Sequence, residues 1–305
     1  MEKWNGPQML EPIKYQKGIA SVAFNGYDQL PTTQQPTTVN MVFYPTFIAT
    51  NIALAGSDIS INETEMQTLN LVKTVMKSRA QDGADDIGNM FQGDSTAFGG
   101  KAPNGLANIV DNGSVASTFG GLSRATYSGL NATVTASGGV VSLLKIRQLA
   151  NSITDGRVAP DLCLTDYTTW SYIEQLLQAF QRNTYSEFQN MDAGAGFKAN
   201  GIIWDGLVIY KDKKVVTGNL YLLNKNFLKF RGLNWYRGKP ITLEDKNIKG
   251  NIYEYNPANA TKGFTWTGFI EAFNQGAVNG FVILGGQLIC TAPFRNGLLN
   301  GITGV

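Results

Sequence analysis

Apolar residues recur at three- and four-residue spacing in three stretches, which predicts three helices. The first covers residues 62–81 and opens with Asn62 and Glu65 in a capping-box pattern. The second covers residues 142–153, and the third follows Asp166, a candidate N-cap. The apolar positions that share one face of the third helix are Trp170, Ile173, Leu177 and Phe180. At a rise of 1.5 Å per residue the first helix would span about 30 Å, which makes it the longest predicted element.

Runs rich in β-branched and aromatic residues predict strands around these helices. Two of them, at 19–27 and 39–48, flank a polar stretch at 28–38 that contains Pro31 and Pro36. This connection is too long for a tight turn, so we expect a projecting two-stranded loop. An isolated hairpin is only marginally stable in water, so the loop needs a neighbour to pack against, a first indication of assembly. The other predicted strands cover residues 162–164, 201–210, 219–223, 227–230 and 281–291.

The composition is that of a folded protein, and the length favours more than one lobe. It has 305 residues, of which 43% are hydrophobic and 16% charged. One hydrophobic core is near its limit at this length, so we expect two subdomains. The sequence has no run of about 18 apolar residues and no basic-apolar leader, so we expect neither a membrane span nor a secretion signal. A net charge of +2 with both signs interspersed predicts only diffuse contact with nucleic acid.

The chain contains no histidine, which excludes triad hydrolases and most zinc enzymes, and we expect no catalytic residue, cofactor or metal. The sequence Gly-Gly-Lys-Ala at 99–102 departs from a phosphate-binding loop. Ser95 stands where the first motif glycine belongs, and Ala102 lacks the hydroxyl that binds magnesium. Cys163 and Cys290 lie in apolar stretches, so we expect two buried reduced thiols.

Two further groups of side chains fit surface or packing roles better than catalysis or ligand binding. The acidic residues, which we interpret as solvated surface groups, are Asp85, Asp86, Glu187, Asp192, Glu244 and Asp245. A paired-carboxylate site needs two of them held together in a cleft, and sequence spacing cannot show this. The aromatic residues that fit a core or a subunit contact better than a stacking groove are Tyr253, Tyr255, Phe264, Trp266, Phe269 and Phe273.

Several short motifs carry a family resemblance. They are GLANIV at 105–110, FGGLSRAT at 119–126, PDLCLT at 160–165, LLQAFQR at 176–182, NGIIWD at 200–205, LYLLN at 220–224 and APFRNG at 292–297. Together with the order of predicted elements, they resemble the major capsid proteins of tailed double-stranded-DNA bacteriophages, which have the Hong Kong 97-type fold. The resemblance rests on motifs from about residue 100 onward and on architecture alone before it.

The resemblance implies an α+β Hong Kong 97-like capsid fold with four parts. These are an N-terminal arm at 1–17, a projecting two-stranded loop at 18–54, a peripheral domain at 55–118 and 234–305 with the long helix at 62–81, and an axial α/β domain at 119–233. The expected intersubunit contacts on the arm and the loop are Trp4, Tyr15, Phe24, Tyr27, Leu30, Val39, Phe43 and Tyr44.

The implied function is that of a structural shell subunit without catalytic chemistry. It would self-assemble into hexamers and pentamers of an icosahedral phage head, in the host cytoplasm, around double-stranded DNA that it contacts non-specifically. The expected partners are a scaffold protein, a portal protein and a decoration protein, with no membrane. Some relatives cross-link through a lysine on the projecting loop. Because 28–38 contains no lysine and Lys14 and Lys17 lie at its base, we expect no covalent cross-links here.

Two alternatives stay open at this point. An encapsulin-type shell that holds enzymes in place of a genome shares the fold. A glycan-binding or glycan-active protein that uses the acidic and aromatic residues belongs to another class, and it would be a monomer or a small oligomer.

Overall fold

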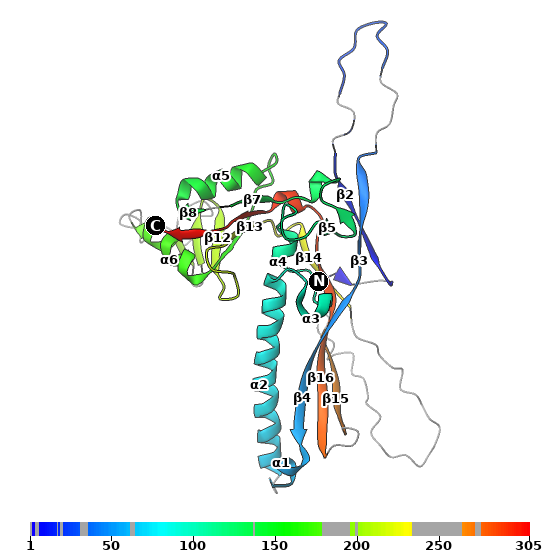
Figure 1. The fold of residues 1–305 in the computed structure, drawn as a ribbon, viewed down its shortest axis with the longest axis vertical. Coiled ribbons are helices and arrows are strands. Elements are labelled where there is room, and N and C mark those ends of the chain that lie inside the picture. Colours follow the sequence, from blue (N-terminus) through cyan, green and yellow to red (C-terminus); the bar gives the residue numbers. More distant parts are fainter. Residues whose placement is uncertain are drawn as a thin grey trace.

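The computed structural model describes residues 2–3, 6–16, 18, 21–30, 36–61, 65–136, 138–178, 196–198, 201–233, 264–271 and 276–305. These residues form an elongated body, a lobe at its side and a loop that projects beyond one end (Figure 1). The long helix α2 (Glu65–Gln92) runs along the body beside strands β4 (Thr46–Ala55), β16 (Ala277–Cys290) and β15 (Phe264–Glu271). The chain is therefore mixed α and β, and its described residues form an elongated body and a lobe.

The body is built on a five-stranded sheet. Strands β1 (Glu2–Lys3), β14 (Leu228–Gly232), β16 and β15 follow one another in this sheet, and β4 pairs with the other edge of β16. The pairing of β4 with β16 is antiparallel and continuous from Thr46–Gly286 to Ala55–Ala277. The short helix α1 (Gly56–Ile61) connects β4 to α2, so that α2 returns along the strand that precedes it.

Helix α2 is longer than its sequence predicts. It has 28 residues and ends at Gln92, whereas the apolar spacing predicts an end at residue 81. The prediction ends there because Gly83 and Gly88 disfavour a helix, but at Gly83 the tertiary structure leaves no room for a side chain. A Cβ added to Gly83 would lie 2.6 Å from the Thr50 Oγ1 of β4. The predicted cap at Asn62 falls outside the described residues.

A seven-stranded sheet forms the lobe. In spatial order its strands are β10 (Gly196–Lys198), β11 (Gly201–Trp204), β12 (Leu207–Lys211), β9 (Leu162–Thr165), β13 (Leu220–Leu223), β17 (Gly297–Leu299) and β7 (Thr133–Thr135). Only the pairs β12–β9 and β17–β7 are parallel. The predicted strand at 201–210 is in fact the hairpin β11–β12, because Asp205 and Gly206 adopt positive φ angles of 52° and 78° and turn the chain.

Both faces of this sheet are buried, which gives the chain two hydrophobic cores. Along β13, Leu220 and Leu222 point into the core beneath α5 (Leu143–Ile153) and α6 (Tyr167–Gln178). Tyr221 and Leu223 point into the second core, at the junction with the body. Alternation along a strand thus divides consecutive residues between the two cores.

The predictions of helices α5 and α6 are confirmed, as is the predicted N-cap Asp166, and the structure adds a second cap at Ser142. The Ser142 side chain accepts a hydrogen bond from the N–H of Lys145. The Asp166 carboxylate accepts hydrogen bonds from the N–H groups of Thr168 and Thr169. These contacts satisfy backbone donors that have no partner within the helix.

The two-stranded ribbon differs from the prediction. Its strands are β2 (Met9–Lys14) and β3 (Thr38–Phe43), paired antiparallel from Met9–Phe43 to Lys14–Thr38. The predicted strand at 19–27 is wrong over its described residues 21–27, which form no strand. The predicted strand at 39–48 is divided by Tyr44 and Pro45 into β3 and β4. Proline has no N–H to donate, so the ladder stops there and β4 enters the body sheet.

Short elements complete the chain. They are α3 (Ala97–Gly100), α4 (Leu106–Ile109), β5 (Thr118–Phe119), β6 (Leu122–Ser123), η1 (Ser128–Leu130), β8 (Gly139–Val140), η4 (Pro293–Arg295) and β18 (Ile302–Gly304). Within the ranges described above, no helix is both long enough and apolar enough to cross a membrane.

Candidate assembly surfaces

The projecting loop starts from a base that is anchored to the body. The Tyr15 hydroxyl donates a hydrogen bond to the Pro36 carbonyl at 3.0 Å, which closes the end of the ribbon. The Tyr15 ring meets Tyr127 edge-on, with 5.1 Å between ring centroids. At the other end of the ribbon, Phe43 packs edge-on against Phe119 at 5.4 Å. The base of the loop is therefore held by aromatic packing as well as by the strand ladder.

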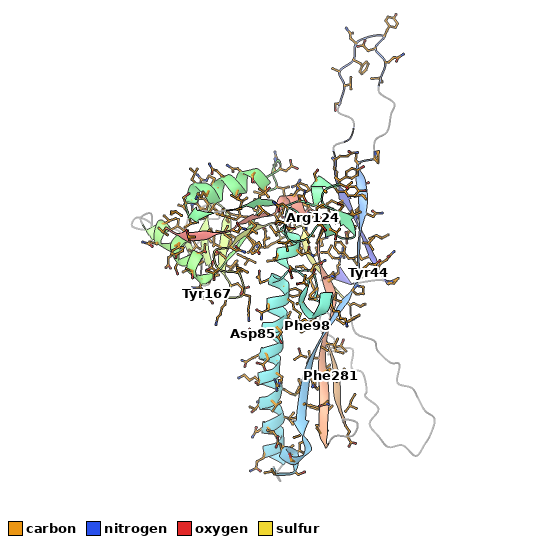
Figure 2. The ribbon with its side chains drawn as sticks, viewed as in Figure 1. Tyr44, Asp85, Phe98, Arg124, Tyr167 and Phe281 are labelled. Carbon is orange, nitrogen blue, oxygen red and sulfur yellow. The ribbon has the colours of Figure 1, made fainter. Side chains whose placement is uncertain are left out.

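A buried ion pair lies beneath this base. Arg124 is 1% exposed, and its guanidinium donates hydrogen bonds to the carbonyls of Asn108, Asp111 and Leu130. Its Nε lies 3.8 Å from the Asp111 carboxylate. That carboxylate also accepts hydrogen bonds from the N–H groups of the turn that follows it, at residues 113–116. The pair ties the segments that support the ribbon to one another. Figure 2 shows Arg124 at the junction of the lobe and the ribbon.

The surroundings of this pair shift both ionisation equilibria. Burial acts to raise the pKa of Asp111, but the hydrogen bonds from Ala116, Ser114, Val115 and Gly113 outweigh it and hold that pKa below its ordinary value. Burial lowers the pKa of Arg124, and the Asp111 charge opposes this change. Both groups stay charged near neutral pH, so the pair is a structural support for the ribbon.

The tip of the loop stands well clear of the rest of the chain (Figure 1). At the tip, the Asp28 N–H donates to the Asn25 carbonyl, and the Asn25 N–H donates to the Asp28 carboxylate, which together form a turn. The apolar side chains exposed on this tip are Val22 at 52%, Phe24 at 61%, Tyr27 at 105% and Leu30 at 55%. Four large side chains exposed within ten residues of one projecting loop make the tip a candidate contact surface.

The structure separates the eight predicted contact residues into groups. Phe24, Tyr27 and Leu30 lie exposed at the tip, and Tyr44 is 64% exposed beside the ribbon. Tyr15 and Val39 are half-buried and pack within their own chain. Phe43 is only 3% exposed and belongs to the core. The period-two pattern of β3 turns Phe43 inward and leaves Tyr44 outward, so Phe43 is covered by its own chain while its role in a subunit contact stays a prediction. Trp4 falls outside the described residues.

Sequence reasoning missed a second exposed apolar surface, on the body sheet. Thr50 faces α2 at Gly83, so the alternate positions of β4 and their partners on β16 point to the opposite face. Phe47 and Phe281 lie on that face, with exposures of 41% and 37%. The sequence signal for this surface was the absence of charged residues from all ten positions of β4, because an exposed strand face usually carries charge.

The described residues offer little for catalysis. They hold no cluster of three acidic, cysteine or histidine side chains that would bind a metal. Asp85 is exposed and pairs with Lys214 at 3.3 Å, which fits the surface role predicted for it, and Asp86 is exposed as well. The acidic residues at 187, 192, 244 and 245 lie outside the described residues. A cleft of about 340 Å³ lies beside α5. The Lys145 ammonium at its wall donates hydrogen bonds to the carbonyls of Gly138 and Val140.

Both thiols are buried and unpaired, as predicted. Burial raises the pKa of Cys163, and burial raises that of Cys290 to about 12. A thiol of this kind is neither a nucleophile nor a metal ligand at neutral pH.

Comparison with known proteins adds information through structure alone. No protein-family model matches the chain, and no curated protein is similar to it in sequence. The cyanophage A-1(L) capsid is similar in structure, with a TM-score of 0.73 over 99% of this chain and 90% of that chain, at 12% sequence identity. The chain has the Hong Kong 97-type capsid fold. The α+β fold predicted from the sequence is thereby confirmed.

Two further structures match this chain with lower TM-scores. That of Mycobacterium phage Bobi matches with a TM-score of 0.55 over 100% of this chain and 89% of that chain, at 8% identity. The SrpI encapsulin of Synechococcus elongatus matches with a TM-score of 0.53 over 98% of this chain and 84% of that chain, at 11% identity. The fold is thus shared by phage capsids and by an encapsulin.

Proposed function

We propose that this chain is the major capsid protein of a tailed bacteriophage, a structural subunit that self-assembles into the hexamers and pentamers of an icosahedral head. The observation that carries the proposal is the likeness to the cyanophage A-1(L) capsid over nearly the whole length of both chains. The exposed apolar tip supports it, because a lone subunit gains nothing from holding four apolar side chains in water. The head would enclose double-stranded DNA and contact it non-specifically.

Within this proposal the parts of the chain have separate tasks. The arm at 1–17 and the loop at 18–54 reach neighbouring subunits, while 55–118 and 234–305 form the peripheral domain and 119–233 the axial domain. Four strands refine this division. β2 of the arm is half of the ribbon, β4 and β14 belong to the body sheet, and β17 lies in the sheet of the lobe. Scaffold, portal and decoration proteins are the further partners. Residues 28–38 contain no lysine, so the shell would be held by non-covalent contacts.

The proposal is tested by the size of the purified chain in solution and on a microscope grid. Mass photometry and negative-stain electron microscopy should detect shells, or capsomers of five and six copies of 33.1 kDa. Boiled and reduced shells should then run as single chains. A chain that stays monomeric at every salt concentration tested, with and without a scaffold protein, would contradict the proposal.

A pair of tip variants tests the role of the loop. Tyr27 is fully exposed, so Tyr27→Ser should leave the unfolding free energy of the subunit unchanged and lower the yield of assembled particles. Tyr27→Phe keeps the ring and should assemble like the wild type. Equal particle yields for the two variants would show that Tyr27 at the tip does not contribute to the subunit interface.

The encapsulin alternative is supported by the likeness to SrpI, at a lower TM-score of 0.53. The contents of particles from the native source distinguish the two. Nuclease-protected genomic DNA supports the phage head, and a co-purifying enzyme without such DNA supports the compartment.

A further inference from the structure

The tip of the projecting loop contains a sequence with chemistry of its own, Asn25–Gly26. An asparagine followed by glycine can cyclise, because glycine has no side chain to hinder attack of its backbone nitrogen on the asparagine amide. The reaction needs a free side-chain amide, a free N–H on the glycine and a backbone that can rotate. Six such pairs lie within the described residues, at 25, 104, 112, 279, 296 and 300.

Asn25 meets the first two conditions, and only a local turn of the exposed tip restrains its backbone. Its backbone N–H and carbonyl take part in the turn with Asp28, and its side-chain amide has no hydrogen-bond partner among the described residues. The Gly26 N–H also has none there. Both residues are exposed, and an added Cβ on Gly26 would find no atom within 4 Å. The pair sits on a loop that extends away from the body, so rotation of its backbone displaces no packed neighbour (Figure 1).

Two of the other pairs are blocked at the glycine or at the asparagine. The Gly113 N–H donates to the Asp111 carboxylate at 3.0 Å, and the Asn112 side chain accepts from Ser114. Asn296 is 0% exposed, and its side chain is hydrogen-bonded on both of its polar atoms.

The remaining three pairs are held by their surroundings. Asn104 uses both of its side-chain polar atoms, and Asn279 lies within β16 between two partner strands. The Asn300 side chain has no hydrogen-bond partner among the described residues, but its backbone is paired with two distant residues: its N–H donates to the Thr135 carbonyl, and its carbonyl accepts from the Gly138 N–H. Asn300 is thus the nearest rival to Asn25.

We propose that Asn25–Gly26 is a spontaneous deamidation site that marks subunits left unassembled. The Gly26 nitrogen loses its proton to solvent and forms a bond to the Asn25 Cγ, and the side-chain nitrogen leaves with a proton as ammonia. Water then opens the five-membered ring at either carbonyl, which gives aspartate or an isoaspartyl linkage. The reaction consumes only water and needs no oxidant or reductant.

The product places a new carboxylate among the exposed apolar side chains of the tip, three residues from the carboxylate of Asp28. Burial of that new charge against another subunit is unfavourable, and it repels the charge of Asp28. A deamidated tip therefore docks less well than a fresh one. This consequence rests on the proposed function, whereas the reaction itself does not.

The chemistry is tested on the full-length unassembled chain by peptide mass mapping during storage in oxygen-18 water. The Asn25 peptide should gain aspartate and isoaspartate on the order of tenfold faster than those of Asn112 and Asn296 in the same digest, as expected for an unhindered intramolecular attack. The rate should rise with pH, since the attacking nitrogen must lose a proton. In denaturant the difference between the sites should disappear. Conversion at Asn25 that is no faster than at Asn112 and Asn296 overturns the assignment.

The consequence is tested with two variants of the same position. Asn25→Asp carries the product charge, and Asn25→Gln keeps a neutral amide that cyclises slowly. We expect a lower particle yield for Asn25→Asp than for Asn25→Gln, and protection of Asn25 from deamidation inside assembled particles. Equal yields overturn the marking role and leave the chemistry intact. If the wild type itself forms no particles, the proposed function fails, and the digest still decides the chemistry.

Discussion

The buried ion pair beneath the ribbon gives a sharp test of what holds this fold together. Replacing Arg124 with methionine keeps much of the side-chain volume and removes every donor. The carbonyls of Asn108, Asp111 and Leu130 then lose their partner, and the Asp111 carboxylate loses its counter-charge. Removal of one partner from a buried pair costs about 3–5 kcal/mol, since the other charge stays behind in a poorly solvated site.

The same substitution at an exposed arginine provides a matched control. Arg147 pairs with Asp205 at 3.1 Å, but both side chains are about half exposed. Exposed pairs contribute about 0–1 kcal/mol, because water solvates either charge when the other is removed. Arg147→Met should therefore cost about 1 kcal/mol or less, including the lost contact with the Trp204 ring.

Urea unfolding of the unassembled subunit, followed by tryptophan fluorescence, measures both costs. Arg124→Lys should lie between the two, because an ammonium cannot copy the forked geometry that reaches three carbonyls. If Arg124→Met cost no more than Arg147→Met, the assignment of Arg124 as a structural centre would be wrong.

Three further predictions concern protonation, packing and thiol access. The pKa of Asp111 is lower in the folded chain than in the unfolded chain. The stability that this carboxylate contributes is therefore complete above about pH 4 and is lost as pH falls through the folded pKa. Measurement of the unfolding free energy at decreasing pH should show this loss in the wild type and a smaller loss in Asp111→Asn. Gly120→Ala should cost about 2–3 kcal/mol in urea unfolding, because its φ is +56° and its Cβ would lie 2.7 Å from the Met41 Cβ. Gly121→Ala, with φ at +75° and nothing within 4 Å, should cost about 1 kcal/mol from strain alone. Because burial raises the pKa of Cys290 to about 12, a thiol reagent should label it only at the rate of unfolding, and fast labelling of the folded chain would contradict its burial.

The elements that sequence reasoning placed correctly are those that local chemistry specifies. Ser142 and Asp166 cap α5 and α6 through hydrogen bonds to nearby backbone groups, so the helix starts are visible in the sequence. The continuous apolar run of β13 likewise predicts a strand. In these places the local pattern and the tertiary structure agree.

The errors arise where distant segments decide the structure. The end of α2 depends on Gly83 meeting Thr50, a contact between residues far apart in the chain. The strand partner of β3 is β2, which the sequence places beyond a long loop, so the register could not be derived locally. Exposure is decided in the same way, because Phe43 and Tyr44 are adjacent aromatics and only the direction of β3 distinguishes the buried one from the exposed one.

The meeting of Gly83 with Thr50 also has a mechanical consequence for the body. Sliding α2 by one turn along β4 would bring Arg79 or Ile87 opposite Thr50, where even a Cβ would approach Oγ1 to 2.6 Å. Helix and strand are therefore locked against translation, and β4 is joined to β16 by a continuous ladder. A force applied along α2 is transmitted through these contacts to both strands, so α2, β4 and β16 should move together as one rigid unit.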